Sequence, residues 1–188
     1  MRDSRRQGLR VRRYPLKPVV PLFALSLAAA ACARPVSETR FLNFDPESSG
    51  GALVEGWSGF EKTGAGDTFV WAQSRDAKVV LLAAGPEDRL VRFRAWPFSW
   101  EGAPPQSVTV SVNGARVATL SLPGGAAVHG VVTPAAAWKD GENALAFEFA
   151  GAEAPKDRVP GAGDARTLAA AFDWIEVVPV RPEGPRQP

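Results

Sequence analysis

The stretch from Ser107 to Leu122 reads SVTVSVNGARVATLSL, and it decides the fold. Its first half alternates valine with serine or threonine, so the valines fall on one face of an extended strand and the hydroxyls on the other. Asn113 and Gly114 follow, and both residue types tolerate the positive φ of a two-residue type I′ turn. The pattern therefore predicts an antiparallel β-hairpin.

Apolar residues recur with the same period of two through the rest of the chain. In the run 90–96, Val91, Phe93 and Ala95 share one face, and two arginines and a tryptophan share the other. The run 78–83 is apolar on both faces, which predicts a central strand. The remaining runs are 68–72, 126–132, 144–149 and 168–180. The alanines that open the last run also fit a helix, but no helical period is sustained after residue 40.

Short strands separated by turn residues predict an all-β fold, an antiparallel two-sheet β-sandwich of the jelly-roll type, over residues 41–180. Residues 150–166 are rich in Gly, Ala, Pro and charge and predict a long loop. The sequence RPEGPRQP at 181–188 predicts a disordered tail. Because Cys32 is the single cysteine, no disulfide can form within the chain, and the sandwich depends on its hydrophobic core.

The N-terminal residues have the pattern of an export signal. Arginines crowd residues 2–17, and an uncharged, largely apolar stretch occupies residues 18–33. That stretch is shorter than the roughly 20 residues that a transmembrane helix needs. A basic head, a short apolar middle and small residues at the end predict a signal-peptide helix over residues 1–31. The alternative is a buried N-terminal helix of the folded protein.

Cys32 follows Ala29, Ala30 and Ala31, and this context resembles the lipobox of bacterial lipoproteins. The resemblance implies that Cys32 is lipidated, that residues 32–40 form a tether, and that a lipid holds the domain at a membrane. Ala33 after the cysteine implies the outer membrane, with the domain periplasmic or exposed at the cell surface. The alternative is ordinary cleavage near Cys32, which would leave no lipid.

The charge is distributed unevenly, and this argues against nucleic acid as a partner. The whole chain has a formal net charge of +2, but residues 1–31 hold seven of its 22 basic residues and one of its 20 acidic residues. The rest of the chain is therefore net acidic, at −4. Nucleic-acid binding requires a continuous basic surface.

Three segments together carry a resemblance: VSVNGARVATLSL at 110–122, WKDGENALAFEFA at 138–150 and AFDWIEVVPV at 171–180. They resemble the galactose-binding-domain-like jelly roll of non-catalytic carbohydrate-binding modules, over roughly residues 65–180. In such modules an acidic residue in the last strand often helps to hold a structural calcium. The resemblance therefore implies a metal site at Asp173, with Asp45 or Glu47 as partner; no other cofactor is expected.

The sequence offers little for catalysis. His129 is the single histidine and lies between small residues in a weak strand, where a structural role is favoured. The sequence contains no Cys/His cluster for zinc, no Gly-x-Ser-x-Gly motif and no phosphate-binding loop. We therefore expect a protein that is not an enzyme.

The tryptophans are the positive signal, since the chain has six of them and one tyrosine. An exposed indole can stack on the apolar C–H face of a sugar. Trp71 and Trp174 lie inside predicted strands, where a place in the core is favoured. The tryptophans that flank loops are the candidate ligand contacts, and these are Trp57, Trp96, Trp100 and Trp138.

The segment 96–101, WPFSWE, is the best candidate platform, because a proline-stiffened loop would present two indoles and a phenylalanine. The alternative is a loop that folds back and caps an open end of the sandwich. Asp164 and Arg166, in the long loop before the last strand, are further candidate ligand contacts. Their alternative is a local ion pair that pins the loop.

The sequence thus predicts a non-catalytic, lipid-anchored protein of the cell envelope whose sandwich binds carbohydrate or polysaccharide. The alternative is a structural or assembly lipoprotein that uses the same sandwich to bind a protein partner in the envelope. Its expected partners are carbohydrate or an envelope protein, together with the membrane that the N-terminal lipid enters.

Overall fold

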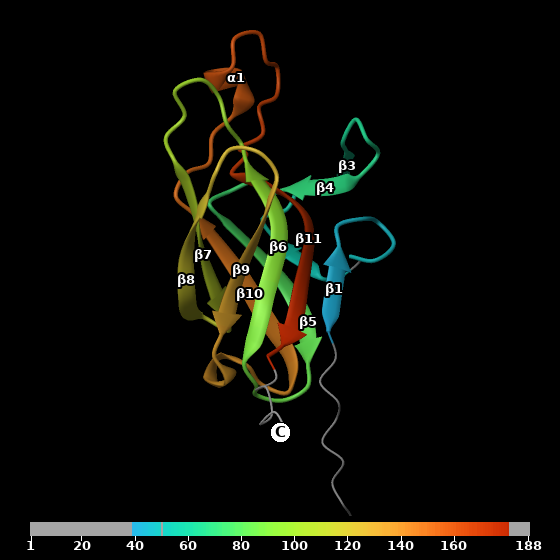
Figure 1. Cartoon of the computed structure of the whole chain (residues 1–188). Coiled ribbons are helices and arrows are strands. Elements are labelled where there is room, and N and C mark those ends of the chain that lie inside the picture. Colours follow the sequence, from blue (N-terminus) through green and yellow to red (C-terminus); the bar gives the residue numbers. More distant parts are fainter. Residues whose placement is uncertain (1–38, 50, 181–188) are drawn as a thin grey trace, which may run out of the picture. The chain divides into compact units, whose positions relative to one another are not determined.

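A computed structural model describes residues 39–49 and 51–180, which form a sandwich of two antiparallel sheets (Figure 1). The predictions for residues 1–31, for Cys32, for nearly all of the tether at 32–40 and for the tail at 181–188 lie outside the described residues. Within the described part, the predicted all-β jelly roll is confirmed.

The first sheet has six strands, in the order β3-β4-β11-β6-β9, and β1 also pairs with β11. Its strands are β1 (Arg40–Asn43), β3 (Glu61–Lys62), β4 (Thr68–Trp71), β6 (Arg89–Pro97), β9 (Ala127–Thr133) and β11 (Ala170–Pro179). The second sheet has five strands, in the order β2-β5-β10-β7-β8. They are β2 (Leu53–Glu55), β5 (Asp76–Ala83), β7 (Gln106–Val112), β8 (Ala115–Leu122) and β10 (Gly141–Phe149). The described helices are the one-turn α1 (Pro155–Arg158) and the 3₁₀ helix η1 (Ala135–Ala137).

Alternation along the strands builds the core, as the sequence predicts. The inward residues of β6, namely Val91, Phe93 and Ala95, are 0 % exposed. They meet the inward residues of β10 from the opposite sheet, and Phe93 and Phe147 lie with ring centroids 5.4 Å apart. Phe172 of β11 contacts both of these rings, which places it at the centre of the aromatic core.

The hairpin predicted over residues 107–122 forms. β7 and β8 are joined by Asn113 and Gly114, which have φ values of 49° and 83°. These are the two positive values that a type I′ turn needs. The strands β5, β6, β9 and β10 also match predicted runs, and β5 lies inside its sheet between β2 and β10. Leu82 of β5, however, is 60 % exposed, so only one face of this strand is fully buried.

β11 is a strand throughout, so its opening alanines are not helical. These alanines are 0 % exposed because they lie between β4 and β6, where small side chains fit beneath larger neighbours. The register shifts between Phe172 and Trp174. This bulge leaves Asp173 and Trp174 both outside the core, between Phe172 and the buried Ile175.

A buried polar network closes the end of the sandwich where β7 turns into β8. The Asn143 side-chain amide donates to the backbone oxygens of Lys139 and Gly141, both at 2.9 Å, and its oxygen accepts from the Lys139 amide at 3.0 Å. The Asn113 side chain donates to the same Asn143 oxygen at 2.7 Å. Because Asn143 is 1 % exposed, these bonds replace water at this end, which we call the closed end.

Candidate functional site

Two of the tryptophans proposed as ligand contacts are structural. Trp138 is 4 % exposed, its indole N–H donates to Thr133 Oγ1 at 2.8 Å, and the Arg89 guanidinium lies 5.2 Å from its ring centroid. The ring of Trp57 lies against Phe44 and Phe172, and its N–H donates to the Lys78 carbonyl at 2.8 Å. Trp138 is therefore buried and Trp57 is partly buried against the core, which argues against the predicted binding role of both.

Trp71 and Trp174 differ from the sequence prediction in the opposite sense. Their positions within strands predict that both rings lie in the core, and both lie outside it. Trp174 follows the bulge of β11 and its ring lies 5.7 Å from that of Phe41, which is 58 % exposed. Trp71 is the last residue of β4, and its ring contacts Phe69 and Phe98.

The segment 96–101 begins as the end of a strand and leaves the sheet after Phe98. Trp96 and Pro97 end β6, and the amide of Phe98 still donates to the Ala169 carbonyl at 3.0 Å, in line with the pairing of β6 and β11. Alternation therefore sends the buried Pro97 inward and the partly exposed rings of Trp96 and Phe98 to the other side. Trp100 lies beyond the strand, is also partly exposed, and its ring contacts that of Phe98. The predicted platform thus has a rigid base.

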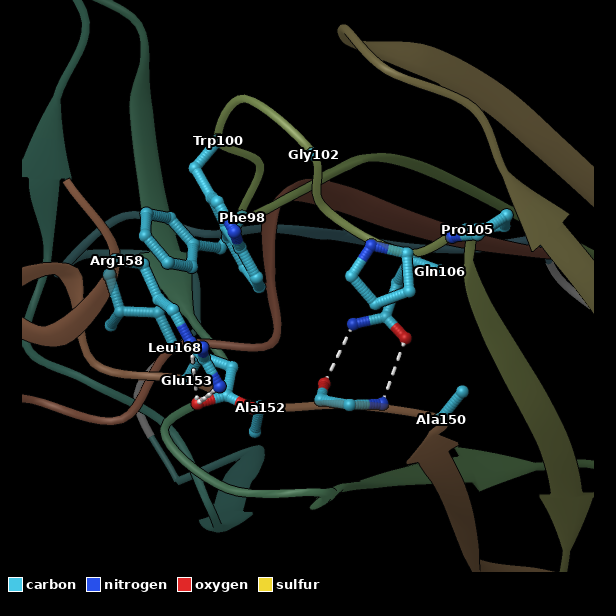
Figure 2. Close-up of a pocket in the computed structure, with 12 residues that line it drawn as sticks. Phe98, Trp100, Gly102, Pro105, Gln106, Ala150, Ala152, Glu153, Arg158 and Leu168 are labelled. Carbon is cyan, nitrogen blue, oxygen red and sulfur yellow. Dashed lines mark hydrogen bonds and ion pairs between the residues drawn. The ribbon is translucent and has the colours of Figure 1, made fainter.

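Phe98 and Trp100 line a pocket of about 300 Å³ at the end of the sandwich opposite the closed end (Figure 2). We call it the loop pocket, because the β6–β7 connection forms one wall and the β10–β11 connection the other. The two rings lie 5.3 Å apart, between centroids. Its remaining lining is Gly102, Pro104, Pro105, Gln106, Ala150, Gly151, Ala152, Glu153, Arg158 and Leu168.

Gln106 fixes the floor of the loop pocket, a role that the sequence did not reveal. Its side-chain amide donates to the Gly151 carbonyl at 2.7 Å, and its oxygen accepts from the Gly151 amide at 3.1 Å. A second acceptor for the same NH₂ group is the Ala169 carbonyl, at 3.3 Å. One side chain at the start of β7 therefore replaces a strand partner for the long loop, and Figure 2 shows the paired bonds.

Glu153 and Arg158 are the charged groups of the loop pocket. Their side chains form an ion pair, with Arg158 Nη2 at 3.0 Å and Nε at 3.2 Å from Glu153 Oε2. The Arg158 guanidinium also lies 5.5 Å from the Trp100 ring centroid, a cation–π distance. Sequence reasoning missed both residues because they lie in a segment that it predicted as loop; α1, which begins at Pro155, turns Arg158 back over the pocket.

Asp164 and Arg166 form the local ion pair that was their alternative interpretation. Arg166 donates to both oxygens of Asp164, and its Nη1 lies 2.5 Å from Glu61 Oε1 on β3. Hydrogen bonds from Arg166 lower the pKa of the Asp164 carboxyl, and those to Asp164 and Glu61 raise the pKa of Arg166. The pair ties the long loop to β3 and does not line the loop pocket.

The carboxylates predicted to hold calcium do not fit that metal. Asp173 forms an ion pair with Arg94, so its carboxylate already has a cationic partner where a metal ion would have to bind. Asp45 accepts from the hydroxyl and amide of Ser48 and from Asn43, and these bonds lower its carboxyl pKa to about 2. Calcium takes six to eight oxygen ligands. Within residues 39–49 and 51–180, no three His, Cys, Asp or Glu side chains come together as a metal site would require.

His129 is placed as a structural residue. Its ring stacks on Phe93, with centroids 5.4 Å apart, and burial lowers its pKa while a hydrogen bond to the Ala95 backbone opposes that shift. Its Nε2 atom is buried and has no partner among the described residues. This contact with a core ring favours a structural role for His129.

The helices in the described part of the chain are too short to cross a bilayer.

Comparison with protein families and with curated proteins gives no match for this chain. Among solved structures, a β-(1,4)-mannanase with a family 35 carbohydrate-binding module, from Podospora anserina, matches with a TM-score of 0.50 and 13% identity, over 78% of this chain and 29% of that one. A family 35 module from an environmental isolate matches with a TM-score of 0.48 and 18% identity, over 76% and 98%. The C-terminal family 6 module of a laminarinase from Zobellia galactanivorans matches at 0.46 and 10%, over 75% and 99%.

At these identities the similarity concerns the fold. The described domain is a jelly roll of the kind found in carbohydrate-binding modules, as the three sequence segments implied. A fold of this kind can carry more than one activity, so what this chain binds has to be argued from its own loop pocket.

Proposed function

We propose that this chain is a non-catalytic, lipid-anchored protein of the cell envelope whose sandwich binds carbohydrate in the loop pocket. The observation that carries the proposal is the meeting of Trp100 and Phe98 with an Arg158–Glu153 ion pair in one pocket. A volume of about 300 Å³ is at the small end of ligand pockets, which suits a terminal sugar or a short part of a glycan.

Each part of the loop pocket has a role in this proposal. The indole of Trp100 offers an apolar face to the C–H groups of a sugar ring. Hydroxyl groups both donate and accept hydrogen bonds, so they can bond to the Glu153 carboxylate and to the Arg158 guanidinium at the same time. Gln106 is already bonded to the loop, so it shapes the pocket and leaves ligand contact to the others.

The envelope location rests on residues outside the described part of the chain. In this proposal residues 1–31 direct export, Cys32 receives the lipid, and the tether leads to β1 at the outer membrane. Labelling cells with a radioactive palmitate analogue checks it: the chain should take up label, and Cys32→Ser should not. Label-free protein with an N-terminus beyond Cys32 would instead support ordinary cleavage.

A glycan array that includes envelope polysaccharides tests carbohydrate binding, with the full chain purified in detergent. Trp100→Ala should weaken binding to the positive glycans by about tenfold or more, since a central aromatic contact supplies a large share of binding energy. Trp174→Ala is the matched control, because that indole is also partly exposed and lies outside the loop pocket; its affinity should stay unchanged. A correctly folded protein that binds no glycan on the array would count against the proposal.

A second candidate function is binding of a protein partner, and β9 favours it. β9 is an edge strand of the six-stranded sheet, and its outward side chains Val128 and Val132 are each 57 % exposed. An exposed apolar edge can receive a strand from another protein. Val128→Lys would abolish such pairing and leave glycan binding intact, whereas Trp100→Ala would do the reverse.

A further inference from the structure

Five aromatic side chains form a continuous ridge that begins in the loop pocket and runs over the outer face of the six-stranded sheet. The ring of Trp100 contacts Phe98 at 5.3 Å, Phe98 contacts Trp71 at 6.3 Å, Trp71 contacts Phe69 at 6.0 Å, and Phe69 contacts Trp96 at 5.3 Å, all between centroids. We call this set the aromatic ridge. Only its first two members line the loop pocket.

The strand register explains how the aromatic ridge is built. Ala171 of β11 pairs with Trp71 of β4 on one side and with Trp96 of β6 on the other. Its methyl group leaves the space between the two indoles to Phe69, which is 8 % exposed and contacts both rings. Because these residues belong to paired strands, the two indoles are held in place before any ligand arrives, and both remain partly exposed.

Ion pairs flank the aromatic ridge along its length, and each contains both signs of charge. The pairs are Arg158–Glu153 at the pocket, Arg166–Glu61 together with Arg166–Asp164 beside β3, and Arg94–Asp173 beside Trp96. The Arg94 guanidinium lies 5.9 Å from the Trp96 ring centroid. The surface therefore offers donors and acceptors in alternation and little net charge.

From this arrangement we propose that the aromatic ridge binds successive sugar units of an uncharged glycan chain, with one end of the bound segment in the loop pocket. The inference rests on the proposed carbohydrate binding and goes further, by naming the class of ligand and a second contact region. A neutral hydroxyl-rich chain can bond to both members of each ion pair. A polyanion could reach the three arginines only by displacing their carboxylate partners, and it would then face four carboxylates, on Glu153, Glu61, Asp164 and Asp173, which disfavours it.

The indole N–H signals of the ¹⁵N-labelled full chain in detergent give a direct readout, since each of the six tryptophans has one indole N–H group. Each is assigned by a Trp→Phe variant. The probes are β-(1,4)-manno-oligosaccharides and β-(1,3)-gluco-oligosaccharides of two to six units, together with the same length series of any other neutral glycan that is positive on the array. Oligogalacturonates of the same lengths are the charged comparison.

We expect the disaccharides to shift Trp100 alone and the hexasaccharides to shift Trp100, Trp71 and Trp96. Affinity should rise by about tenfold or more with length, as each added stacking contact contributes. Trp96→Ala should remove that gain and leave disaccharide affinity within about twofold. Trp174→Ala, the matched control, should change neither value, and oligogalacturonates should bind more weakly at every length.

The outcomes separate the two proposals. If disaccharide and hexasaccharide bind equally and shift Trp100 alone, the aromatic ridge is not a binding surface, and the loop pocket stands. Preference for oligogalacturonates would overturn the assignment of an uncharged chain. If no glycan on the array or in the length series binds, both proposals fail. Because the wild-type shifts are assigned with the conservative Trp→Phe variants, a Trp96→Ala chain that fails to fold would leave the test intact.

Discussion

The two ends of this sandwich differ in the length of their connecting loops and in how side chains bond to the loop backbone. At the closed end the connections are short, Asn113 and Asn143 satisfy the loop backbone from inside, and the buried Trp138 donates to the Thr133 hydroxyl. At the opposite end the connection from β10 to β11 is long, and the side chains of Gln106 and Arg75 anchor it near its start. The long loop leaves the loop pocket between itself and the β6–β7 connection. The difference indicates that one end serves stability and the other is available for recognition.

Among the variants that test this comparison, Trp138→Ala should have the largest effect on stability. Trp138→Ala should lower the free energy of unfolding by about 3–5 kcal/mol, because it removes a buried ring and leaves a cavity. Trp100→Ala at the open end should cost about 1 kcal/mol or less, as expected for a partly exposed side chain. Urea unfolding followed by circular dichroism measures both. Equal losses would mean that the two ends contribute alike to stability.

A somewhat smaller effect is expected at Asn143. Asn143→Ala should destabilise the fold by about 1–3 kcal/mol, because the backbone groups of Lys139 and Gly141 lose their buried partner. The urea midpoint should fall with no change in the slope of the transition. Thr109→Ala makes a suitable control, since its hydroxyl bonds to Thr119 on the outer face of the second sheet and should cost less. An Asn143→Ala protein as stable as wild type would contradict the stabilising role assigned to the closed end.

At the open end, Gln106→Ala should loosen one loop rather than the whole domain. We expect a global loss of about 1 kcal/mol and a marked increase in hydrogen exchange at the Gly151 amide, which donates to Gln106. Exchange at the core amide of Val110 should change no more than global stability does. Uniform acceleration across both amides would show that the long loop is part of the cooperative core.

The pH dependence between 7.5 and 5.5 should depend on His129. Burial lowers its pKa in the folded chain below the ordinary 6.5, so the unfolded chain takes up the proton first. Stability should therefore be full above pH 7 and fall as the pH drops through about 6.5. His129→Phe keeps an aromatic ring on Phe93 and should flatten this slope. A slope that survives in the variant would assign it to other groups.

The smallest effect concerns calcium, and the expected effect is none. Because Asp173 is paired with Arg94 and Asp45 with hydrogen-bond donors, adding millimolar calcium or a chelator should leave the thermal midpoint unchanged. The Arg94→Gln variant frees the Asp173 carboxylate and makes a useful comparison. A midpoint that rises with calcium in the wild-type chain would restore the metal site implied by the sequence resemblance.

The sheets were predictable because strand alternation is a local property. Val108, Val110 and Val112 in β7, like the inward residues of β6, have the burial that their spacing predicts. The Asn-Gly turn was equally predictable, because positive φ restricts the residue types that can occupy it.

The tryptophans were predicted poorly because exposure depends on how elements meet. Trp138 and Trp57 flank loops, yet Trp138 is buried and the ring of Trp57 packs against the core beside Phe172. Trp71 lies in a strand, yet that strand has an outward face and the residue lies on it. The charged pair Glu153–Arg158 was missed for the same reason, since only the path of the long loop brings it to Trp100.

The strand that carries Trp96, and whose pairing extends to the Phe98 amide, has a consequence for the energetics of ligand binding. Rings mounted on hydrogen-bonded backbone have little rotational freedom left to lose when a ligand arrives, so the entropic penalty of association falls mainly on the ligand. A flexible glycan would then bind with a penalty set by its own linkages. Stiff and pliable glycans of equal composition should differ in affinity for that reason alone.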